Sequence, residues 1–245
     1  MRIAVAGGTG VVGHHVVAAL EAAGHEAVVL TRSTGVDLEA GTGLDAALEG
    51  VAAVIDTSNV LTLSRDRAVE FFTAATGNLL AAEERAGVGH HVALSIVGVD
   101  RVDFGYYEGK RRQERLVLAA SVPGTVLRAT QFHEFAEQTL ARSRGPVAVV
   151  PRMRSQPVAA REVGAELARL AAGPAVGAAP ELAGPEELEM TDMVRAVVRR
   201  RGSRRVVLPL RVPGQAGKAM AGGGLLPTGP GPRGQQTFAE WLDQR

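Results

Sequence analysis

The segment MRIAVAGGTGVVGHHVVAALEAA, residues 1–23, carries the clearest structural signal in the chain. The short apolar run 2–6 predicts a β-strand, and the Ala-rich pattern of residues 14–23 predicts a helix. Between them lies GGTGVVG, residues 7–13, with a glycine at every third position. A glycine pattern that follows a strand and opens a helix is typical of a turn that binds a dinucleotide.

Each spaced glycine of this turn has a separate expected role. Gly7 permits a tight turn out of the strand, Gly10 lets backbone approach a pyrophosphate, and Gly13 lets helix and strand pack closely. The start of the helix points its N–H groups and its positive dipole end at the anion. The cofactor-binding residues predicted here are Gly7, Thr9, Gly10, Val11, Val12 and Gly13.

Composition limits the class of protein and its partners. The chain has 245 residues, 46% hydrophobic and 22% charged, which is enough for one good-sized core. The net charge of +1 gives no global attraction to nucleic acid or to an anionic membrane. The absence of cysteine excludes disulfides, thiolate catalysis and cysteine-ligated metals, and we predict no metal site. With no apolar run of about 18 residues and no signal-peptide pattern, we expect a cytoplasmic protein, monomeric or homodimeric, that acts on a small molecule.

Strands and helices are expected to alternate after the first helix. Apolar runs predict strands at 27–30, 51–55, 92–97 and 125–129, and helical patterns fill 44–48, 67–86 and 104–120. This alternation predicts an α/β fold, a Rossmann-like doubly wound parallel sheet. We expect residues 1–130 to form an NAD(P)-binding domain and residues 131–245 a smaller C-terminal substrate lobe packed on it.

The C-terminal half has a looser pattern. Helices are expected at 131–142, 161–172, 191–200 and 237–242, the third of them capped by Thr191 or a neighbour. Extended segments are expected at 147–151, 155–160 and 206–208. The Gly- and Pro-rich stretch 214–234 predicts a long ordered loop.

The end of the second strand predicts which dinucleotide binds. A carboxylate there would bind the adenosine ribose hydroxyls of NAD, but the sequence is Thr31-Arg32-Ser33. Because an arginine can pair with a 2′-phosphate, Arg32 favours NADP over NAD, with NAD still possible and a plain surface charge as the alternative. Asp37, followed by Leu38, could accept from the adenine amino group.

Polar residues also follow the third strand, as Asp56-Thr57-Ser58-Asn59. Ligands of parallel sheets bind beyond the carboxyl ends of the strands. We therefore expect this segment to line the cofactor groove and assign Thr57 and Ser58 to it.

A phenol, an ammonium and a hydroxyl are candidates for the chemistry. Tyr106 and Lys110 stand four apart at a helix start and so share a face, and Ser95 lies near the end of a strand. A phenol can transfer a proton, a nearby ammonium lowers the phenol pKa, and a hydroxyl can hold a substrate oxygen. Lys110 could also bind the nicotinamide ribose. Tyr107 is a rival for the phenol role, and an ordinary helix start with a surface lysine is the non-catalytic alternative.

With these motifs the chain resembles the short-chain dehydrogenase/reductase superfamily, in its atypical branch of NmrA-like and NAD(P)H-binding proteins. The resemblance rests on the glycine turn, Asp37-Leu38, the Tyr106–Lys110 pair and the segments LSIVG (94–98), LRATQF (127–132) and TFAEWL (237–242). It implies that Ser95, Tyr106 and Lys110 form a catalytic trio that Asn78 completes. It also implies that 130–132 pass beside the nicotinamide, which makes Gln131 a cofactor-binding candidate. Phe132, His133 and Phe135 are then pocket candidates, with His133 either a second acid or base or a structural hydrogen-bonding residue.

The resemblance implies two possible functions. The first is an NAD(P)H-dependent oxidoreductase that reduces a carbonyl- or quinone-type metabolite, with hydride from the nicotinamide and the proton from Tyr106. The alternative is a catalytically idle NADP(H)-sensing regulator of the NmrA-like type, because some members of the branch keep the cofactor site and lose the trio. Since this chain retains Ser95, Tyr106 and Lys110, we favour the enzyme.

Overall fold

The computed structural model describes residues 1–143 and 145–245, which form two compact units. The first unit contains residues 1–95, 104–128 and 161–179. The second contains residues 96–103, 129–160 and 180–245.

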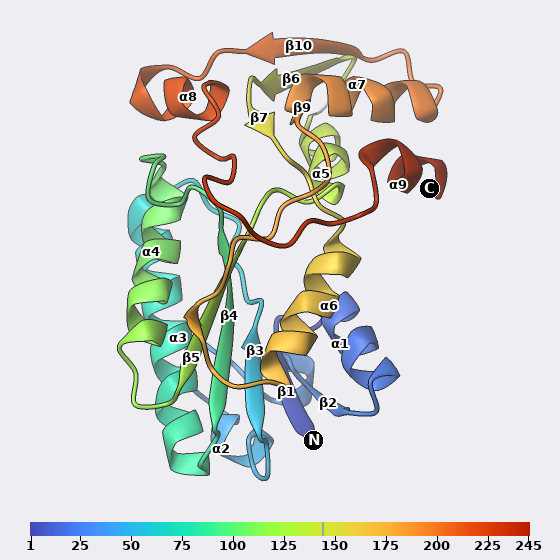
Figure 1. Cartoon of the computed structure of the whole chain (residues 1–245). Helices are drawn as coiled ribbons and strands as arrows, with labels where there is room; N and C mark the ends of the chain where they lie inside the picture. The colour runs from blue at the N-terminus through green and yellow to red at the C-terminus, as the bar shows by residue number, and fades with distance from the viewer. Residues whose placement is uncertain (144) are drawn as a thin grey trace. The chain divides into compact units, whose positions relative to one another are not determined.

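The first unit is built on a six-stranded sheet with the order β2-β1-β3-β4-β5-β8 (Figure 1). The pairs β1–β2, β1–β3, β3–β4 and β5–β8 run parallel, as expected for a doubly wound sheet. β1 is buried along Ile3–Ala6, which explains its continuous apolar sequence. The strands are β1 (Arg2–Ala6), β2 (Glu26–Leu30), β3 (Ala53–Asp56), β4 (His90–Ile96), β5 (Gly124–Ala129) and β8 (Gly177–Ala178).

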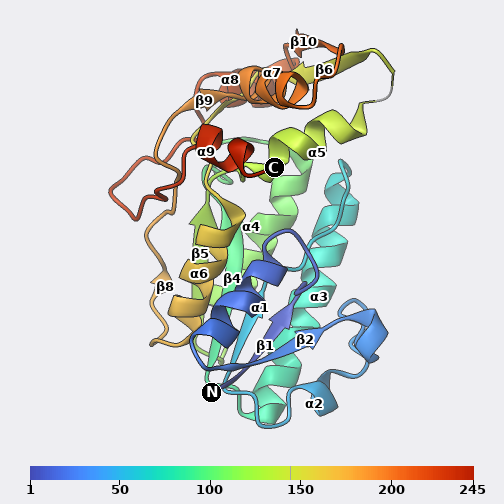
Figure 2. The ribbon, with the colours of Figure 1, turned by 90° about the vertical axis from the view of Figure 1, so that its right-hand side faces the viewer.

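Helices cover both faces of this sheet (Figures 1 and 2). On one face lie α1 (Gly13–Ala22) and α6 (Ala160–Ala171), and on the other α3 (Arg65–Ala86) and α4 (Gly105–Leu118). Phe72 and Leu79 of α3 are fully buried on the apolar side of that helix. Shorter helical turns, η1 (Arg32–Thr34) and α2 (Leu44–Ala47), follow β2.

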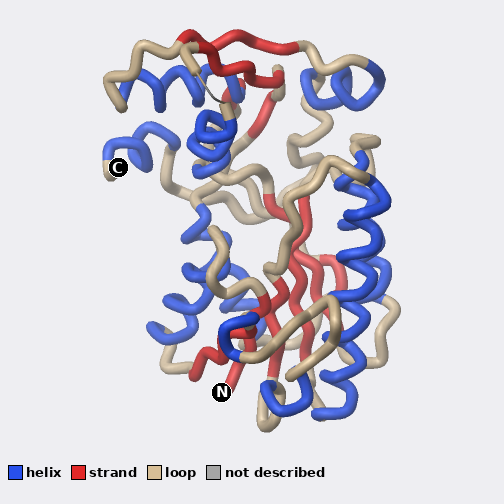
Figure 3. The backbone as a smooth tube through the Cα atoms, turned by 180° about the vertical axis from the view of Figure 1, so that it is seen from behind, coloured by secondary structure: helices blue, strands red, loops and turns tan. Residues whose placement is uncertain are grey.

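The second unit contains helices and short strands, shown by type in Figure 3. β6 pairs parallel with β10, β7 pairs antiparallel with β9, and α7 packs on β6 and β10. A capping box between Thr237 and Glu240 starts α9. The elements are α5 (Glu134–Arg142), β6 (Val147–Pro151), β7 (Arg154–Ser155), β9 (Leu188–Glu189), α7 (Met190–Arg200), β10 (Val206–Leu210), α8 (Gly214–Ala221) and α9 (Phe238–Asp243).

The predicted Rossmann-like fold class is confirmed, but the predicted boundary at residue 130 does not describe the two units. Residues 161–179 belong to the first unit, because α6 packs on α1 and β8 extends the sheet beside β5. The contact is close: a side chain at Gly164 would lie 2.8 Å from the backbone of His15 in α1.

Three local predictions are also wrong. The stretch 214–234 begins with helix α8, so it is not all loop. Thr191 lies inside α7, whose N-cap Glu189 makes no side-chain capping bond. The helix expected from residue 131 begins only at Glu134, because the backbones of Gln131 and His133 hydrogen-bond to Val158.

No helix of the described residues combines the length and the apolar character needed to cross a bilayer.

Candidate functional site

The glycine turn packs against the end of β3 and leaves one glycine open. Gly7 has a φ of +74°, and a side chain there would lie 2.8 Å from the Thr57 carbonyl group. A side chain at Gly13 would overlap the Gly7 carbonyl oxygen. By contrast, a side chain at Gly10 would meet only the Gly7 oxygen, at 3.1 Å. The turn therefore needs glycine at Gly7 and Gly13 for its own folding, whereas a side chain at Gly10 would meet a single backbone atom.

The start of α1 offers uncompensated donors. Its N-cap Val12 provides no side-chain cap, and the first turn carries no acidic residue. The N–H groups of Val11 and Val12 find no acceptor within the described part of the chain. Free N–H groups together with the positive end of the helix dipole suit a bound pyrophosphate.

The end of β2 presents an arginine to solvent. Thr31 caps η1 by accepting from the Thr34 N–H at 3.3 Å, and Arg32 is the exposed first residue of that turn. The Arg32 side chain makes no hydrogen bond or ion pair with residues 1–143 or 145–245. Its guanidinium is therefore available to a phosphate.

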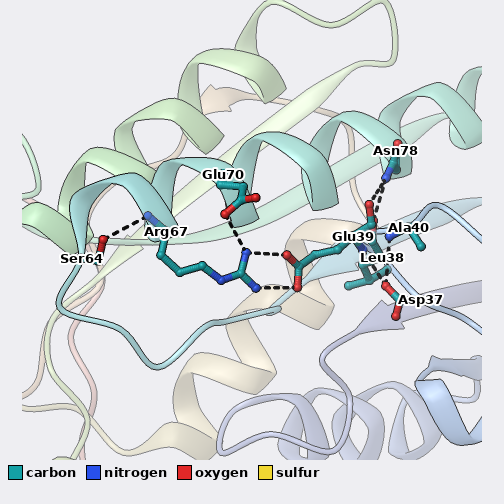
Figure 4. A network of polar contacts seen from close by, with 8 residues as sticks. All are labelled: Asp37, Leu38, Glu39, Ala40, Ser64, Arg67, Glu70 and Asn78. Atoms are coloured by element: carbon teal, nitrogen blue, oxygen red, sulfur yellow. Dashed lines mark hydrogen bonds and ion pairs between the residues drawn. The ribbon is translucent and has the colours of Figure 1, made fainter.

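The loop that follows is fixed to α3 (Figure 4). The Asp37 carboxylate accepts from the backbone of Glu39 and Ala40 at 2.9 and 3.0 Å. The Asn78 amide donates to the carbonyl oxygens of residues 38 and 39, both at 2.9 Å, and Arg67 pairs with the Glu39 carboxylate at 2.6 and 2.9 Å. This clamp holds the Asp37 loop in one conformation.

The candidate phenol is hydrogen-bonded to the loop after β3. The Tyr106 hydroxyl donates to Asn59 Oδ1 at 2.7 Å, and its ring packs edge-on against Phe72 at 5.8 Å. Burial, and then the neighbouring Tyr107, raises the pKa of Tyr106 above its ordinary range. Tyr107 is itself buried against Phe104, and burial raises its pKa too. Both phenols are held in the neutral form.

Lys110 lies inside the unit rather than at its surface. Its ammonium donates to the Leu94 carbonyl oxygen and to Gln113 Oε1, each at 2.9 Å, and stands 4.4 Å from the centre of the Phe72 ring. Gln113 in turn donates to Asp56 at 2.8 Å. Burial lowers the pKa of Lys110 to about 8, against the opposing charges of Asp56 and Glu114.

Two serine hydroxyls are buried without a partner among the described residues. Ser95, near the end of β4, is 3% exposed, and Ser58, just beyond β3, is 4% exposed. A buried hydroxyl without a hydrogen bond carries a free-energy penalty. Both are therefore candidates for a bond to a bound molecule. No group of three or more metal-ligating side chains occurs within the described ranges.

Comparison with known proteins agrees with this arrangement. The family model described as "NAD dependent epimerase/dehydratase family" matches residues 3–97, which include the glycine turn. No curated protein matches the chain significantly in sequence.

Three solved structures are similar over nearly the whole chain. A short-chain dehydrogenase/reductase superfamily protein from Agrobacterium tumefaciens with bound NAD has a TM-score of 0.71 at 20% identity, covering 100% of this chain and 95% of its own. The NADPH-dependent quinone oxidoreductase of Escherichia coli complexed with NADPH has a TM-score of 0.71 at 21% identity, covering 99% of both chains. The triphenylmethane reductase of Citrobacter sp. complexed with NADP(H) has a TM-score of 0.69 at 18% identity, covering 94% and 93%.

This is the short-chain dehydrogenase/reductase fold. The superfamily resemblance predicted from the sequence motifs is thus supported by the family match and by the solved structures. Within this fold, the structure shows where each candidate site residue lies.

The trio residues all belong to the first unit. Tyr106 and Lys110 share a face of α4, since both contact Phe72. The Lys110 ammonium is buried and donates to Leu94 and Gln113, so Lys110 is not the surface lysine of the non-catalytic alternative, and its binding to a ribose stays a prediction. Ser95 has the unpartnered hydroxyl that its expected role requires.

Two polar predictions need correction. Asn78 does not complete the trio, because its amide is used to clamp the loop at Leu38. The side-chain amide that accepts the Tyr106 hydrogen bond belongs to Asn59. Asn59 lies in the segment expected to line the cofactor groove, but the sequence assigned no role to it. The Thr57 hydroxyl donates to the Ala6 carbonyl oxygen at 2.8 Å, so it ties two strand ends together.

The remaining candidates belong to the second unit. Gln131 accepts from the Ser155 hydroxyl at 2.9 Å. His133 is fully buried, with its ring 5.6 and 5.7 Å from those of Phe238 and Trp241 and its Nε2 3.0 Å from the Gln236 carbonyl oxygen. This packing supports the structural interpretation of His133 over that of a second acid or base.

Proposed function

We propose that this protein is an NADPH-dependent reductase of a carbonyl- or quinone-type small molecule. The observation that carries the proposal is the Tyr106 phenol, held neutral at a helix start in the same unit as an open glycine turn. A neutral phenol is a proton donor, which a reductase requires at the substrate oxygen. The E. coli quinone oxidoreductase and the Citrobacter triphenylmethane reductase are reductases with this fold.

The residues fit a nicotinamide dinucleotide. The free N–H groups of Val11 and Val12 would hold the pyrophosphate, Gly10 leaves it room, and Arg32 would pair with a 2′-phosphate. The bound cofactor supplies the hydride. Tyr106 then donates its proton to the substrate oxygen, and the Ser95 hydroxyl orients that oxygen. Lys110 contributes a buried positive charge one helical turn from the phenol.

The preference for NADPH is tested by titration. NADPH and NADH are titrated into the wild-type protein, Arg32→Ala and, as a matched control, Arg211→Ala, since Arg211 is likewise an exposed arginine. A charge-assisted bond of about 1.5–3 kcal/mol corresponds to a loss of about tenfold to a hundredfold in NADPH affinity for Arg32→Ala alone. Equal NADPH and NADH affinities in the wild-type protein, or an equal loss in the control, would refute the role of Arg32.

Catalysis is tested by following NADPH oxidation over a panel of ketones, aldehydes and quinones. Tyr106→Phe should lose about 10²- to 10⁴-fold in turnover and keep its NADPH affinity. Tyr107→Phe is the matched control and should keep its turnover. Wild-type turnover in Tyr106→Phe would exclude Tyr106 as the proton source.

One observation favours the regulatory alternative. The Tyr106 hydroxyl and two of the three N–H donors of Lys110 are directed to protein acceptors, as in a site that binds a cofactor without turning it over. A sensor would bind NADPH tightly, oxidise it with no compound of the panel, and retain a protein partner in pull-downs to a degree that changes with the NADPH/NADP ratio. A reductase would show turnover and no such dependence.

A further inference from the structure

Asn59 is the residue that holds the candidate phenol. It is the third residue after β3 and is exposed to solvent. Its Oδ1 accepts two hydrogen bonds, one from the Tyr106 hydroxyl at 2.7 Å and one from the Val60 backbone N–H at 2.8 Å. Both partners lie in the first unit.

The Val60 bond fixes which way the Asn59 amide faces. A backbone N–H can only donate, so the side-chain oxygen and not the nitrogen must point to it. The same oxygen faces Tyr106, and the phenol must therefore be the donor in the shared bond. Its proton points at Asn59, and its lone pairs are left for another donor.

We propose that Asn59 is a positioning residue that keeps Tyr106 in its proton-loaded form and so biases the site toward reduction. This inference rests on the proposed function. A hydrogen bond to the neutral form of a group disfavours its ionised form, because the ionised phenol would face the negative end of the amide dipole. Reduction starts from the neutral phenol, whereas oxidation of an alcohol needs the phenolate as base.

The balanced step shows where Asn59 acts. The substrate C=O bond becomes C–OH: carbon takes the hydride from the reduced nicotinamide dinucleotide, and oxygen takes the Tyr106 proton. The phenolate takes up a proton from water, and the Tyr106 hydroxyl again donates to Asn59 Oδ1. In the reverse direction Tyr106 must first lose its proton against the Asn59 carbonyl dipole.

The other contacts of Tyr106 within residues 1–143 and 145–245 include no anion. On α4 its ionisable neighbours are Tyr107 and, one turn along, Lys110. From α3 it meets the uncharged ring of Phe72, and from the loop after β3 it meets Asn59. Among these contacts, the Asn59 oxygen is the acceptor that binds the phenolic proton.

The test uses the scarcity of tyrosine. The chain has 2 tyrosines, so Tyr107→Phe leaves Tyr106 alone, and its ¹³Cζ resonance reports the ionisation state directly. The spectrum is followed between about pH 7 and about pH 11 in this background and with Asn59→Leu, Asn59→Asp or Thr62→Val added. Asn59→Leu keeps the size and removes the acceptor, Asn59→Asp keeps an acceptor, and Thr62→Val perturbs the same loop without touching Asn59.

We expect the fraction of ionised Tyr106 at high pH to rise roughly tenfold in Asn59→Leu, which corresponds to a fall of about one pKa unit. It should stay at or below the reference in Asn59→Asp and unchanged in Thr62→Val. An unchanged fraction in Asn59→Leu, or an equal rise in Thr62→Val, would overturn the proposal. If Tyr107→Phe does not fold, the same variants are made in the wild-type chain and Tyr106 is assigned by its loss in Tyr106→Phe.

A second measurement separates this proposal from the proposed function. On a substrate that turns over, Asn59→Leu should raise kcat for oxidation about tenfold, because more of Tyr106 is phenolate, and change kcat for reduction much less, with the KM for NADPH unchanged. An equal change in both directions, or no gain in oxidation, would contradict the directional role. If no substrate turns over, the proposed reductase fails, while the ¹³C measurement still decides whether Asn59 controls the phenol.

Discussion

The burial of Lys110 predicts a pH dependence of stability that depends on this one side chain. Lys110 is 5% exposed, and its ammonium donates to Leu94 and Gln113. Burial, opposed by Asp56 and Glu114, holds its pKa at about 8 instead of the ordinary 10.5. Because the pKa is lowered on folding, the unfolded chain binds the proton more tightly, and stability should rise as pH increases from about 8 to about 10.5.

The size of the effect follows from the two pKa values. Each tenfold difference in proton affinity is worth about 1.4 kcal/mol, so a charged Lys110 costs the folded protein about 3 kcal/mol near pH 7. Near pH 10 most of this cost is gone, because the folded protein holds the amine neutral. The expected gain between these two pH values is about 2 kcal/mol.

The assay compares urea unfolding of the wild-type protein and Lys110→Met at about pH 7 and about pH 10. At each pH the free energy of unfolding of Lys110→Met is subtracted from that of the wild-type protein. The change of this difference with pH reports Lys110 alone, because the contributions of all other titrating groups cancel. The loss of the two Lys110 hydrogen bonds changes that difference by the same amount at every pH, so it does not change how the difference varies with pH. Lys218, which is exposed on α8, provides the control Lys218→Met, for which we expect no change of the stability difference with pH.

A difference that stays constant within about 0.5 kcal/mol would refute the buried position of Lys110. The ammonium would then lie in water, where the pKa of a lysine is ordinary and where it could bind a ribose, as the sequence first suggested. In that case Lys110→Met should instead weaken NADPH binding.

Three further predictions concern the turn, a buried ion pair and a helix start. Gly13→Ala should lower the free energy of unfolding by at least about 1–3 kcal/mol in a urea titration, because its Cβ would overlap the Gly7 carbonyl oxygen; an unchanged midpoint would contradict this packing. His91 and Glu83 are both fully buried and 2.8 Å apart, and although burial opposes the charge, the carboxylates of Glu83 and Asp56 raise the pKa of His91. The stabilisation by that pair should therefore be complete below about pH 6.5 and fall as pH rises through the raised pKa of His91. His91→Gln should lose this pH dependence in unfolding curves. The same dependence of stability on pH in His91→Gln and the wild-type protein would count against a charged His91. Thr237→Ala should cost about 1 kcal/mol in thermal unfolding through loss of the capping box of α9, whereas Thr237→Ser should not.

The parts of the fold that the sequence predicted correctly depend on local signals. The strand, turn and helix of residues 1–23 are defined by apolar periodicity and glycine spacing, and the same patterns place β2, β3, β4 and β5 to within a few residues, whereas the two-residue strand β8 was not predicted. The sequence analysis placed the helix at 161–172 in the C-terminal lobe and not in the first unit, because helix periodicity shows which face is buried and not against what it packs. Helix α8 was missed because Gly214 and Gly217 lower helix propensity, while the close approach of Gly217 to the Val212 carbonyl oxygen requires a residue without a side chain.

In the candidate site, too, local sequence signals were predicted correctly and tertiary contacts were not. The spacing of Tyr106 and Lys110 correctly predicted that they share a helix face. It could not show that Leu94 and Gln113 take the ammonium, because Leu94 belongs to another element and its carbonyl has no sequence signal. Likewise, two asparagines were available for the trio, and only the tertiary structure assigns Asn59 to Tyr106 and Asn78 to the loop at Leu38.

The binding of a nicotinamide dinucleotide at the glycine turn is tested most directly by titrating NADPH into the wild-type protein and Gly10→Asp. A side chain at Gly10 meets only the Gly7 oxygen, at 3.1 Å, so this variant should fold with nearly wild-type stability. Its carboxylate would stand where the pyrophosphate is expected and would repel it. We predict saturable NADPH binding to the wild-type protein and none to folded Gly10→Asp; no binding to the wild-type protein, or equal binding to both, would contradict it.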